Sequence, residues 1–272
     1  MKVGYVSNLF ISDNINKINE KVLSLTHEAK TLDLNFLVCS GGISHNYQTT
    51  IKFVEELGKQ LTSFGIGFRF IVGNTDYYYP KDNEVNKQAK FRKIQAMYNA
   101  SPYYLPNNPI NAKNTRIQGF ETWYDYSLYR GKPRELKSIT SKSFFGFKND
   151  DVVYITNKHD YLSGIEETFD FRYCRETQSK MISKLDLALN KWGTPMHNVA
   201  VIWFVPSTNF LKNSIMEKYM GSFKGSQRYL NILSDYNISE CIVGIKCNNP
   251  YPERLKGMKF LNSGNQITVV EY

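Results

Sequence analysis

The sequence predicts an α/β fold that starts with the order βαβαβ. Short apolar segments typical of buried strands alternate with longer segments whose apolar residues recur at helical spacing. This alternation implies parallel strands joined by right-handed crossovers. The 272 residues, 42% of them hydrophobic, are enough for one large buried core, so we predict a single domain over residues 1–272.

The first third of the chain contains the five elements of this start. The predicted strands are 2–6, 36–39 and 68–72, and the predicted helices are 15–29 and 48–64. One face of the first helix carries Ile15, Ile18, Val22 and Leu25, and one face of the second carries Ile51, Val54, Leu57 and Leu61. Both faces are therefore expected to pack against a sheet.

The pattern after residue 76 is looser. A helix is expected over 84–98 and a Pro/Asn-rich surface loop over 101–114, within a loop or lid region of about 77–150. Further predictions are strands at 151–156 and 199–205, a turn at His197, and a helix over 176–192 that buries Ile182, Leu185, Leu189 and Trp192. Residues 258–272 are expected to form paired strands around Ser263-Gly264-Asn265.

Composition limits the environment and the partners. The chain starts with a strand-like run and has no stretch of 18 apolar residues, so we expect a cytoplasmic protein with no membrane partner. The four cysteines, Cys39, Cys174, Cys241 and Cys247, lack C-x-x-C spacing, which favours reduced thiols over a disulfide or zinc site. The net charge of +9 favours anionic partners, although the lysines are spread along the chain and solubility is the preferred explanation.

Four short segments follow strand-like runs, at the places where open α/β sheets bind ligands. They are Val6-Ser7-Asn8-Leu9-Phe10, Ser40-Gly41-Gly42, Gly73-Asn74-Thr75-Asp76 and Gly244-Ile245-Lys246-Cys247. In order and flanks these segments resemble the calcineurin-like metallophosphoesterases, whose patterns D-x-H, G-D, G-N-H-D and G-H-x-H also follow strands. Residues 119–127 resemble the G-x-x-x-W-Y-D-Y-S segment of bacterial members, and residues 201–206 resemble V-V-T-H-F-V-P.

The resemblance covers essentially the whole chain and implies a sandwich of two mixed β-sheets flanked by helices. In this family two cations about 3.5 Å apart activate water and hold the phosphate. The ligand positions are taken here by Asn8, Phe10, Gly42, Asn74, Thr75, Trp203, Ile245 and Cys247, in chain order. Only Asn74 is the family's own residue, since Asn8 and Gly42 stand at aspartates and the others at histidines. The resemblance therefore indicates a degenerate member, and the bias toward Lys, Asn, Ile and Tyr suggests an AT-rich bacterial or mobile-element source.

The residues at these ligand positions have in common that they are uncharged, and several of them are apolar. Two neutral amides cannot offset the charge of two divalent cations, and buried carboxylates left without those cations would be costly. Phe10, Trp203 and Ile245 are expected to fill the former metal cavity with apolar groups. Asp76, whose family equivalent supports the site, is expected to bond backbone N–H groups of its loop.

These losses predict a pseudoenzyme that has no metal cofactor and acts as a binding or interaction module. A protein is the expected partner. Alternatively, an anion is cradled by the turn amides of 40–42 and 73–75 with Lys246 in place of the cations.

Two further alternatives stay open. One is a phosphoesterase that needs no metal or uses a displaced site built from Asn8, Asn74, His45 and Asp76; His159 is another loop histidine, with less claim to a role. The other is a nucleic-acid-binding protein, since 34 Lys and Arg face 25 Asp and Glu, and tyrosines cluster at 77–79, 103–104 and 124–129. For these tyrosines we prefer packing within the protein.

Overall fold

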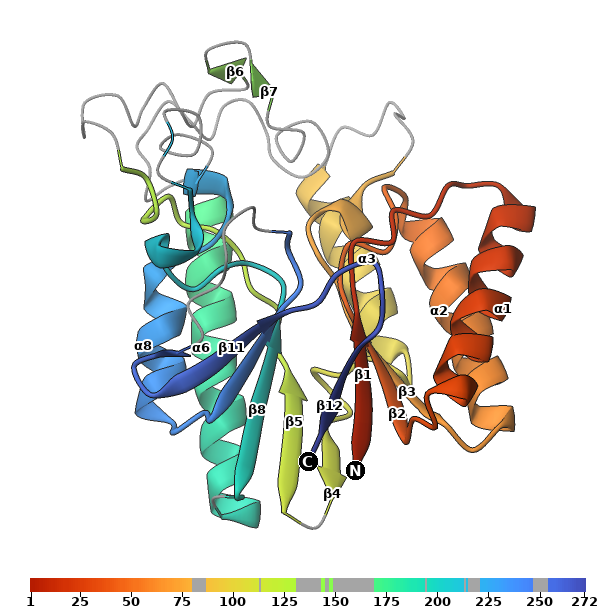
Figure 1. Cartoon of the computed structure of the whole chain (residues 1–272). Coiled ribbons are helices and arrows are strands. Elements are labelled where there is room, and N and C mark those ends of the chain that lie inside the picture. The colour runs from red at the N-terminus through yellow and green to blue at the C-terminus, as the bar shows by residue number, and fades with distance from the viewer. Residues whose placement is uncertain are drawn as a thin grey trace.

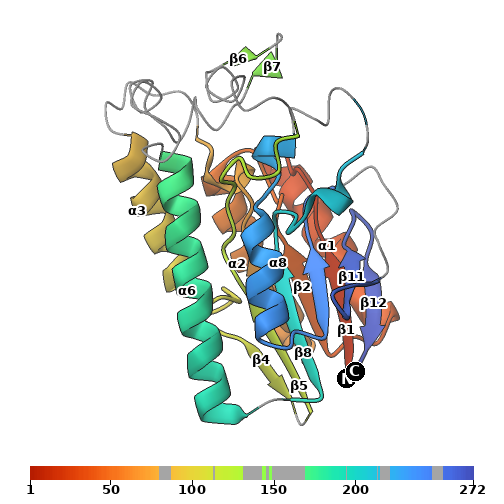
Figure 2. The same ribbon diagram turned by 90° about the vertical axis from the view of Figure 1, so that its left-hand side faces the viewer.

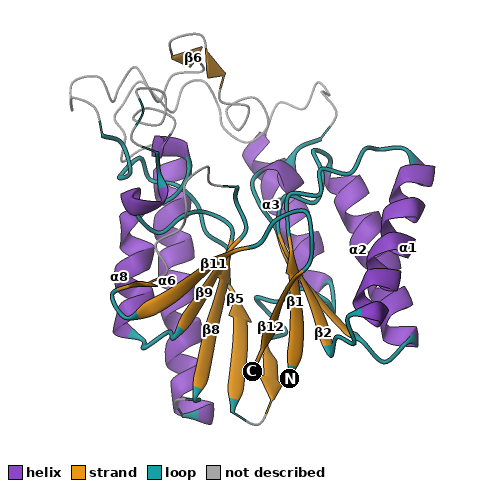
Figure 3. Ribbon diagram, in the orientation of Figure 1, coloured by secondary structure: helices purple, strands orange, loops and turns teal. Residues whose placement is uncertain are grey.

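Two β-sheets occupy the middle of the molecule, and helices cover their outer sides. The structure is a computed structural model, and it describes residues 1–79, 87–112, 114–130, 169–193, 195–212, 214, 221–246 and 254–272, with two short strands at 143–144 and 147–148. In Figure 1, α1 and α2 flank one sheet, and α6 and α8 flank the other. The coloring by secondary structure in Figure 3 shows the strands between these two pairs of helices.

The first sheet contains the amino-terminal half of the fold. Its members are β1 (Lys2–Val6), β2 (Phe36–Ser40), β3 (Gly67–Ile71) and β12 (Thr268–Glu271), in the order β12-β1-β2-β3. The first three strands are parallel, and β12 pairs antiparallel with β1. The crossovers are α1 (Ile15–Thr31) and α2 (Tyr47–Ser63), which begin where Asn14 and Asn46 cap their first turns.

The second sheet has six strands in the order β10-β11-β9-β8-β5-β4. They are β4 (Ile110–Ala112), β5 (Thr115–Gly119), β8 (His197–Ile202), β9 (Glu240–Val243), β10 (Arg254–Leu255) and β11 (Met258–Asn262). The four inner strands are parallel, and the two edge strands are antiparallel to their neighbors. The expected start βαβαβ and the two mixed sheets are therefore confirmed.

Three more helices accompany the second half of the chain. They are α3 (Lys87–Ala100), α6 (Phe169–Trp192) and α8 (Gln227–Asp235). Figure 2 shows α3 beside α6, with α8 on the other side of α6. Short 3₁₀ turns occur at Thr75–Tyr77, Thr208–Phe210 and Gly221–Phe223, and β6 (Ser143–Phe144) pairs with β7 (Phe147–Lys148) apart from both sheets.

The expected hairpin at the carboxyl end is wrong. Strand β11 pairs with β9 in the second sheet, whereas β12 pairs with β1 in the first, so the turn at 263–265 crosses between the sheets. This crossing is held by hydrogen bonds from Ser7 N to Gly264 O (2.7 Å) and from Ser263 N to Val243 O (3.2 Å). Strand β11 thus has a parallel partner and β12 an antiparallel partner, and both partners lie outside residues 258–272. The local pattern in residues 258–272 therefore could not indicate either pairing.

Other boundaries and faces also differ from expectation. His197 begins β8 instead of lying in a turn, and β8 ends at Ile202 because the chain then bends around Trp203. Helix α6 starts at Phe169, earlier than expected, and Ile182 is 37% exposed on its outer side. Ile15 is likewise exposed, since it opens α1 before the buried stripe begins.

The remaining predictions concern the expected lid region and segments that the structure does not describe. The span 77–150 contains α3, β4 and β5, so much of the described part of the expected lid belongs to the packed fold. The strand at 151–156, His159 and Cys247 lie outside the described residues. No helix in the described ranges is both long and apolar enough to cross a membrane.

Candidate functional site

The strand-end segments of both sheets meet around the indole of Trp203. Trp203 follows β8, and it is only 2% exposed. Four glycines from the ends of β2, β3 and β9 surround it: Gly41, Gly42, Gly73 and Gly244. We call this arrangement the glycine cage. The expected convergence of the four segments at the carboxyl ends of the strands is thus observed.

The glycine cage leaves no room for side chains. A Cβ atom added at Gly41, Gly42 or Gly73 would lie 2.5 Å from a carbon of the Trp203 ring, and one at Gly244 would lie 2.7 Å from it. Such distances are far shorter than carbon–carbon contacts in packed proteins, which are about 3.5–4.0 Å. The indole therefore takes the space that side chains on these turns would otherwise enter.

Asn74 fixes the orientation of this indole. Trp203 Nε1 donates a hydrogen bond to Asn74 Oδ1 at 3.0 Å. The bond satisfies a donor that is buried with the ring, and a buried indole N–H usually has such a partner. Asn74, the metal-ligand position that the sequence resemblance leaves unchanged, thus binds Trp203, which the resemblance places at a histidine.

Asn8 connects the two sheets. Its backbone has a positive φ of 54°, a conformation that asparagine tolerates better than most residues. Its Nδ2 donates to Ser7 Oγ at 2.6 Å and to Gly244 O at 2.7 Å. The amide nitrogen is therefore engaged by acceptors within the protein, in place of the carboxylate expected at a metal site.

Asp76 is fully buried, and its carboxylate accepts five hydrogen bonds of 2.8–3.1 Å. The donors are the backbone N–H groups of Gly42, Ile43, Ser44 and Gly73 and the hydroxyl of Thr50. Burial raises the pKa of the Asp76 carboxyl, and these hydrogen bonds oppose the shift. The expected role of Asp76 in bonding loop amides is observed.

The same contacts bear on the expected anion cradle. The N–H groups of Gly42 and Gly73, in the two turns considered for the cradle, already donate to Asp76. An internal carboxylate thus binds these two amides, which the alternative of an anion cradle assigned to an external anion. Lys246 is exposed next to Ile245, which is half-buried and whose backbone N–H donates to Trp203 O at 2.9 Å.

Phe10 does not fill the crevice as expected. Its side chain is 44% exposed, and its ring stacks on His45 with centroids 5.1 Å apart. A positive φ of 43° turns the residue away from the interior. Of the two aromatic residues expected to fill the crevice, Trp203 therefore lies at the center and Phe10 lies at the surface.

Three serine hydroxyls beneath the crevice had no role in the sequence-based interpretation. Ser40 Oγ and Ser263 Oγ are 2.6 Å apart, and Ser7 Oγ donates to Ser263 O at 2.7 Å. All three residues are buried, and they join the first sheet to the crossing segment. Ser7 and Ser40 belong to the strand-end segments, but Ser263 carries no local signal, because both of these serine partners are more than two hundred residues away from it in sequence.

These side chains do not fit a dinuclear metal center. Among the residues that the structure describes, no three His, Cys, Asp or Glu side chains come together as a group able to hold a metal ion. The displaced site considered from sequence is not assembled either, since His45 is exposed against Phe10 and Asp76 is enclosed by its donors. Thr75, which the sequence resemblance places at another histidine, has a buried Oγ1 without a hydrogen-bond partner in the described ranges.

Most tyrosines of the three clusters are packed inside the protein, and Tyr103 and Tyr129 are half-buried. Tyr77, Tyr104 and Tyr126 are each at most 2% exposed. The tryptophan of the W-Y-D-Y-S segment, Trp123, donates from Nε1 to the buried Asp170 at 2.9 Å, and Tyr126 donates to the other oxygen of that carboxylate at 2.9 Å. The burial of most of these tyrosines agrees with the preferred interpretation of the aromatics as packing groups.

The comparisons with known proteins concern the fold. No protein-family model and no curated protein matches the sequence. The crystal structure of phosphopantetheinyl hydrolase (PptH) from Mycobacterium tuberculosis is similar, with a TM-score of 0.66 and 13% identity over 97% of this chain and 89% of that one. A dimetal phosphatase from Danio rerio matches more weakly, with a TM-score of 0.48 and 11% identity over 97% and 88% of the two chains. At such identities the similarity to PptH establishes a metallophosphoesterase-like fold, and it carries no activity with it.

Proposed function

We propose that this chain is a catalytically inactive metallophosphoesterase-like protein, retained as a binding or interaction module. The observation that supports the proposal is the indole of Trp203 inside the glycine cage. The family places a histidine at this position, and hydrolysis in the family depends on two cations held nearby. A bulky neutral ring, held by Asn74, stands there instead.

The contacts around the ring support the same proposal. Cations need ligands with free lone pairs, and the Asp76 carboxylate already accepts five hydrogen bonds. Asn8 points its amide nitrogen, a donor, at two protein oxygens. Opening this region to metal would break these bonds and remove a buried aromatic side chain, at a cost of about 3–5 kcal/mol for the ring alone.

The partner of such a module is proposed to be a protein in the cytoplasm. Loss of the reaction together with retention of the fold leaves recognition as the property that the scaffold can still provide. A single domain over 1–272 remains part of this proposal. Nucleic acid is a weaker candidate because most of the tyrosines that prompted it are buried, which leaves the net charge of +9 as its main support.

Metal analysis combined with a hydrolysis assay tests the proposal. The purified protein is incubated with manganese, iron or zinc, desalted, analyzed for bound metal, and assayed on a chromogenic phosphodiester. We expect no stoichiometric metal and no hydrolysis above buffer. Two equivalents of metal together with turnover would refute the proposal, and turnover without metal would favor a metal-independent phosphoesterase.

A further inference from the structure

A pocket lies away from the glycine cage, toward the other ends of the strands. It has a volume of about 570 Å³ and is formed by β3, the loop before β4, β5 and the last turns of α6. Arg116, the second residue of β5, lies in its wall, so the pocket is near the amino ends of the strands. Trp203 lies at the opposite, carboxyl ends. In Figure 2 the lower end of α6 approaches β4 and β5 in this part of the molecule.

The charged residues that line this pocket are all positive. Its lining includes Arg69, Arg116, Lys184 and Lys191, and no lining residue in the described part of the chain is acidic. Cations that share a pocket repel one another, and low-dielectric walls strengthen their field. The pocket is thus suited to an anion.

Arg116 is the least satisfied of these cations. The residue is 5% exposed, and its Nη2 donates to Gly193 O at a long 3.3 Å. Its Nε is buried and has no partner in the described ranges. A guanidinium carries five N–H donors, and buried donors are almost always paired in native proteins. Gln118, two residues along the same strand face, adds a buried Oε1 that is also unpaired among described residues.

Two of the other cations, Arg69 and Lys184, have neutral hydrogen-bond partners. Arg69 donates from Nε to Asn108 O at 2.8 Å and from Nη1 to Phe68 O at 2.7 Å. Lys184 donates to Pro106 O and to Asn107 Oδ1. Burial lowers the pKa of Arg69, Arg116 and Lys184, which is the effect of desolvating cations. Carbonyl and amide oxygens orient Arg69 and Lys184 without neutralizing them, and of these two Lys184 has an opposing charge nearby, that of Glu121 in the neighboring pocket.

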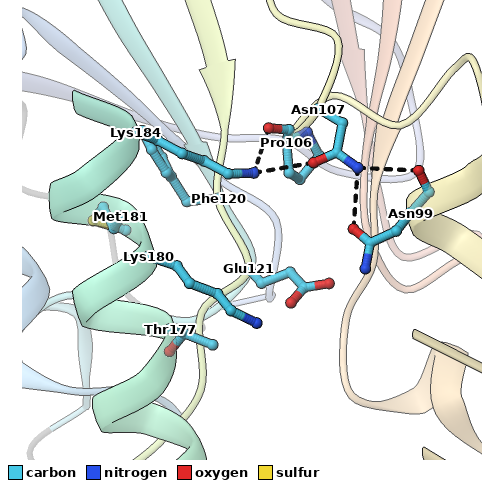
Figure 4. Close-up of a pocket in the computed structure, with 9 residues that line it drawn as sticks. All are labelled: Asn99, Pro106, Asn107, Phe120, Glu121, Thr177, Lys180, Met181 and Lys184. Carbon is cyan, nitrogen blue, oxygen red and sulfur yellow. Dashed lines mark hydrogen bonds between the residues drawn. The ribbon is translucent and has the colours of Figure 1, made fainter. Parts of the chain in front are cut away.

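The neighboring pocket provides a contrast (Figure 4). It has a volume of about 310 Å³ and shares Lys184 with the larger one, but it also contains Glu121. Glu121 accepts hydrogen bonds from Gln95 at 2.7 Å and Tyr173 at 2.9 Å, and Lys180 pairs with Glu176 at 2.7 Å. Charges of both signs are present there. The preference for an anion is therefore specific to the pocket around Arg116.

We infer that the pocket around Arg116 binds a small organic phosphate, with the phosphate held by Arg116 and Arg69. Its volume is in the range of small-molecule sites and exceeds what inorganic phosphate needs. Pro106 and Leu187 provide apolar contact for a carbon skeleton, and the described lining contains no aromatic ring on which a nucleobase would stack. The ligand class is thus a phosphorylated metabolite without a base, such as a sugar phosphate. This inference does not depend on the crevice at Trp203 being inactive.

Calorimetric titration with a hexose phosphate tests the inference, with the unphosphorylated hexose and inorganic phosphate as comparison probes at matched ionic strength. We expect saturable binding of the hexose phosphate, weaker binding of inorganic phosphate and none of the hexose. Arg116→Gln should weaken binding by at least about tenfold, since a charge-assisted hydrogen bond is lost. Lys52→Gln, which removes an exposed charge on α2 outside the pocket, should leave it unchanged.

Arg69→Gln serves as a second variant if Arg116→Gln fails to fold, and it should weaken binding in the same direction. Circular dichroism of each variant separates a folding defect from a binding defect. Absence of saturable binding by the wild-type protein would overturn the inference. Equal effects of the pocket variants and Lys52→Gln would overturn it as well, because the binding would then follow net charge alone.

Discussion

Replacing Gly73 with alanine should destabilize the protein only while Trp203 is present. Gly73 is the member of the glycine cage best suited to this test, since its φ is not positive and its three nearest contacts for an added Cβ are all atoms of the Trp203 ring, at 2.5–2.9 Å. Overpacking of this kind costs about 1–3 kcal/mol. We expect Gly73→Ala to lower the free energy of unfolding by that amount.

A double-mutant cycle isolates the contact. Trp203→Ala alone should cost about 3–5 kcal/mol, because it empties a buried site. In that background the Cβ that Gly73→Ala introduces has space, and the substitution then stabilizes by about 0.4–1 kcal/mol through the unfolded state. The two effects of Gly73→Ala should thus differ by at least about 1.4 kcal/mol, a coupling typical of residues in contact.

Urea denaturation followed by circular dichroism measures the four free energies. Gly264→Ala is the matched control, since Gly264 also lacks a positive φ and has open space around an added Cβ. This control should change stability by less than about 1 kcal/mol in both backgrounds. Equal costs of Gly73→Ala with and without the indole would refute the packing of Trp203 against the turn after β3.

Three further predictions concern buried ionizable groups. Asp76→Asn should lower the free energy of unfolding, measured by urea denaturation, by about 2–5 kcal/mol. In either orientation of the amide, its NH₂ group would face two or more groups that donate to the carboxylate in the native protein. A loss below about 1 kcal/mol would contradict this prediction. Burial raises the pKa of several tyrosines above the ordinary value of 10.0, among them Tyr77, Tyr98, Tyr104, Tyr173 and Tyr229. The stability gained by keeping these hydroxyls protonated is therefore complete below about pH 10 and is lost above it. Their absorbance change should accompany alkaline unfolding, and titration near pH 10 in the folded protein would argue against their burial. In a Cys247→Ser background the remaining thiols are those of Cys39, Cys174 and Cys241, and burial raises the pKa of all three. They should therefore react with a disulfide reagent only when the protein unfolds, and rapid labeling of the native protein would contradict this prediction.

The order of elements was predictable because it is recorded locally. Helical spacing located α1 and α2, and apolar runs located the first three strands, so the start βαβαβ and the meeting of the strand ends followed. The exposure of Ile15 and Ile182 was not predictable from spacing. Both occupy the helical stripe, but Ile15 is the first residue of α1 and Ile182 faces away from the sheet.

The center of the candidate site was predicted in part. Sequence order placed Trp203 and Asn74 at the strand ends, and the structure brings them to hydrogen-bonding distance. The apolar character of Phe10 suggested burial, but its positive φ sends the ring to the surface, and backbone conformation at one residue has no clear sequence signal. Likewise, the pairing of β12 with β1 joins the two ends of the chain, which no local pattern records.

The central proposal is that an indole stands at the strand ends where the sequence resemblance would place two metals. Diffraction from crystals soaked in manganese, with data collected at the manganese absorption edge, tests it most directly. We predict density for the Trp203 ring within the glycine cage and no anomalous peak among Asn8, Gly42 and Asn74. Two anomalous peaks at these strand ends, with the ring displaced from the cage, would contradict the claim.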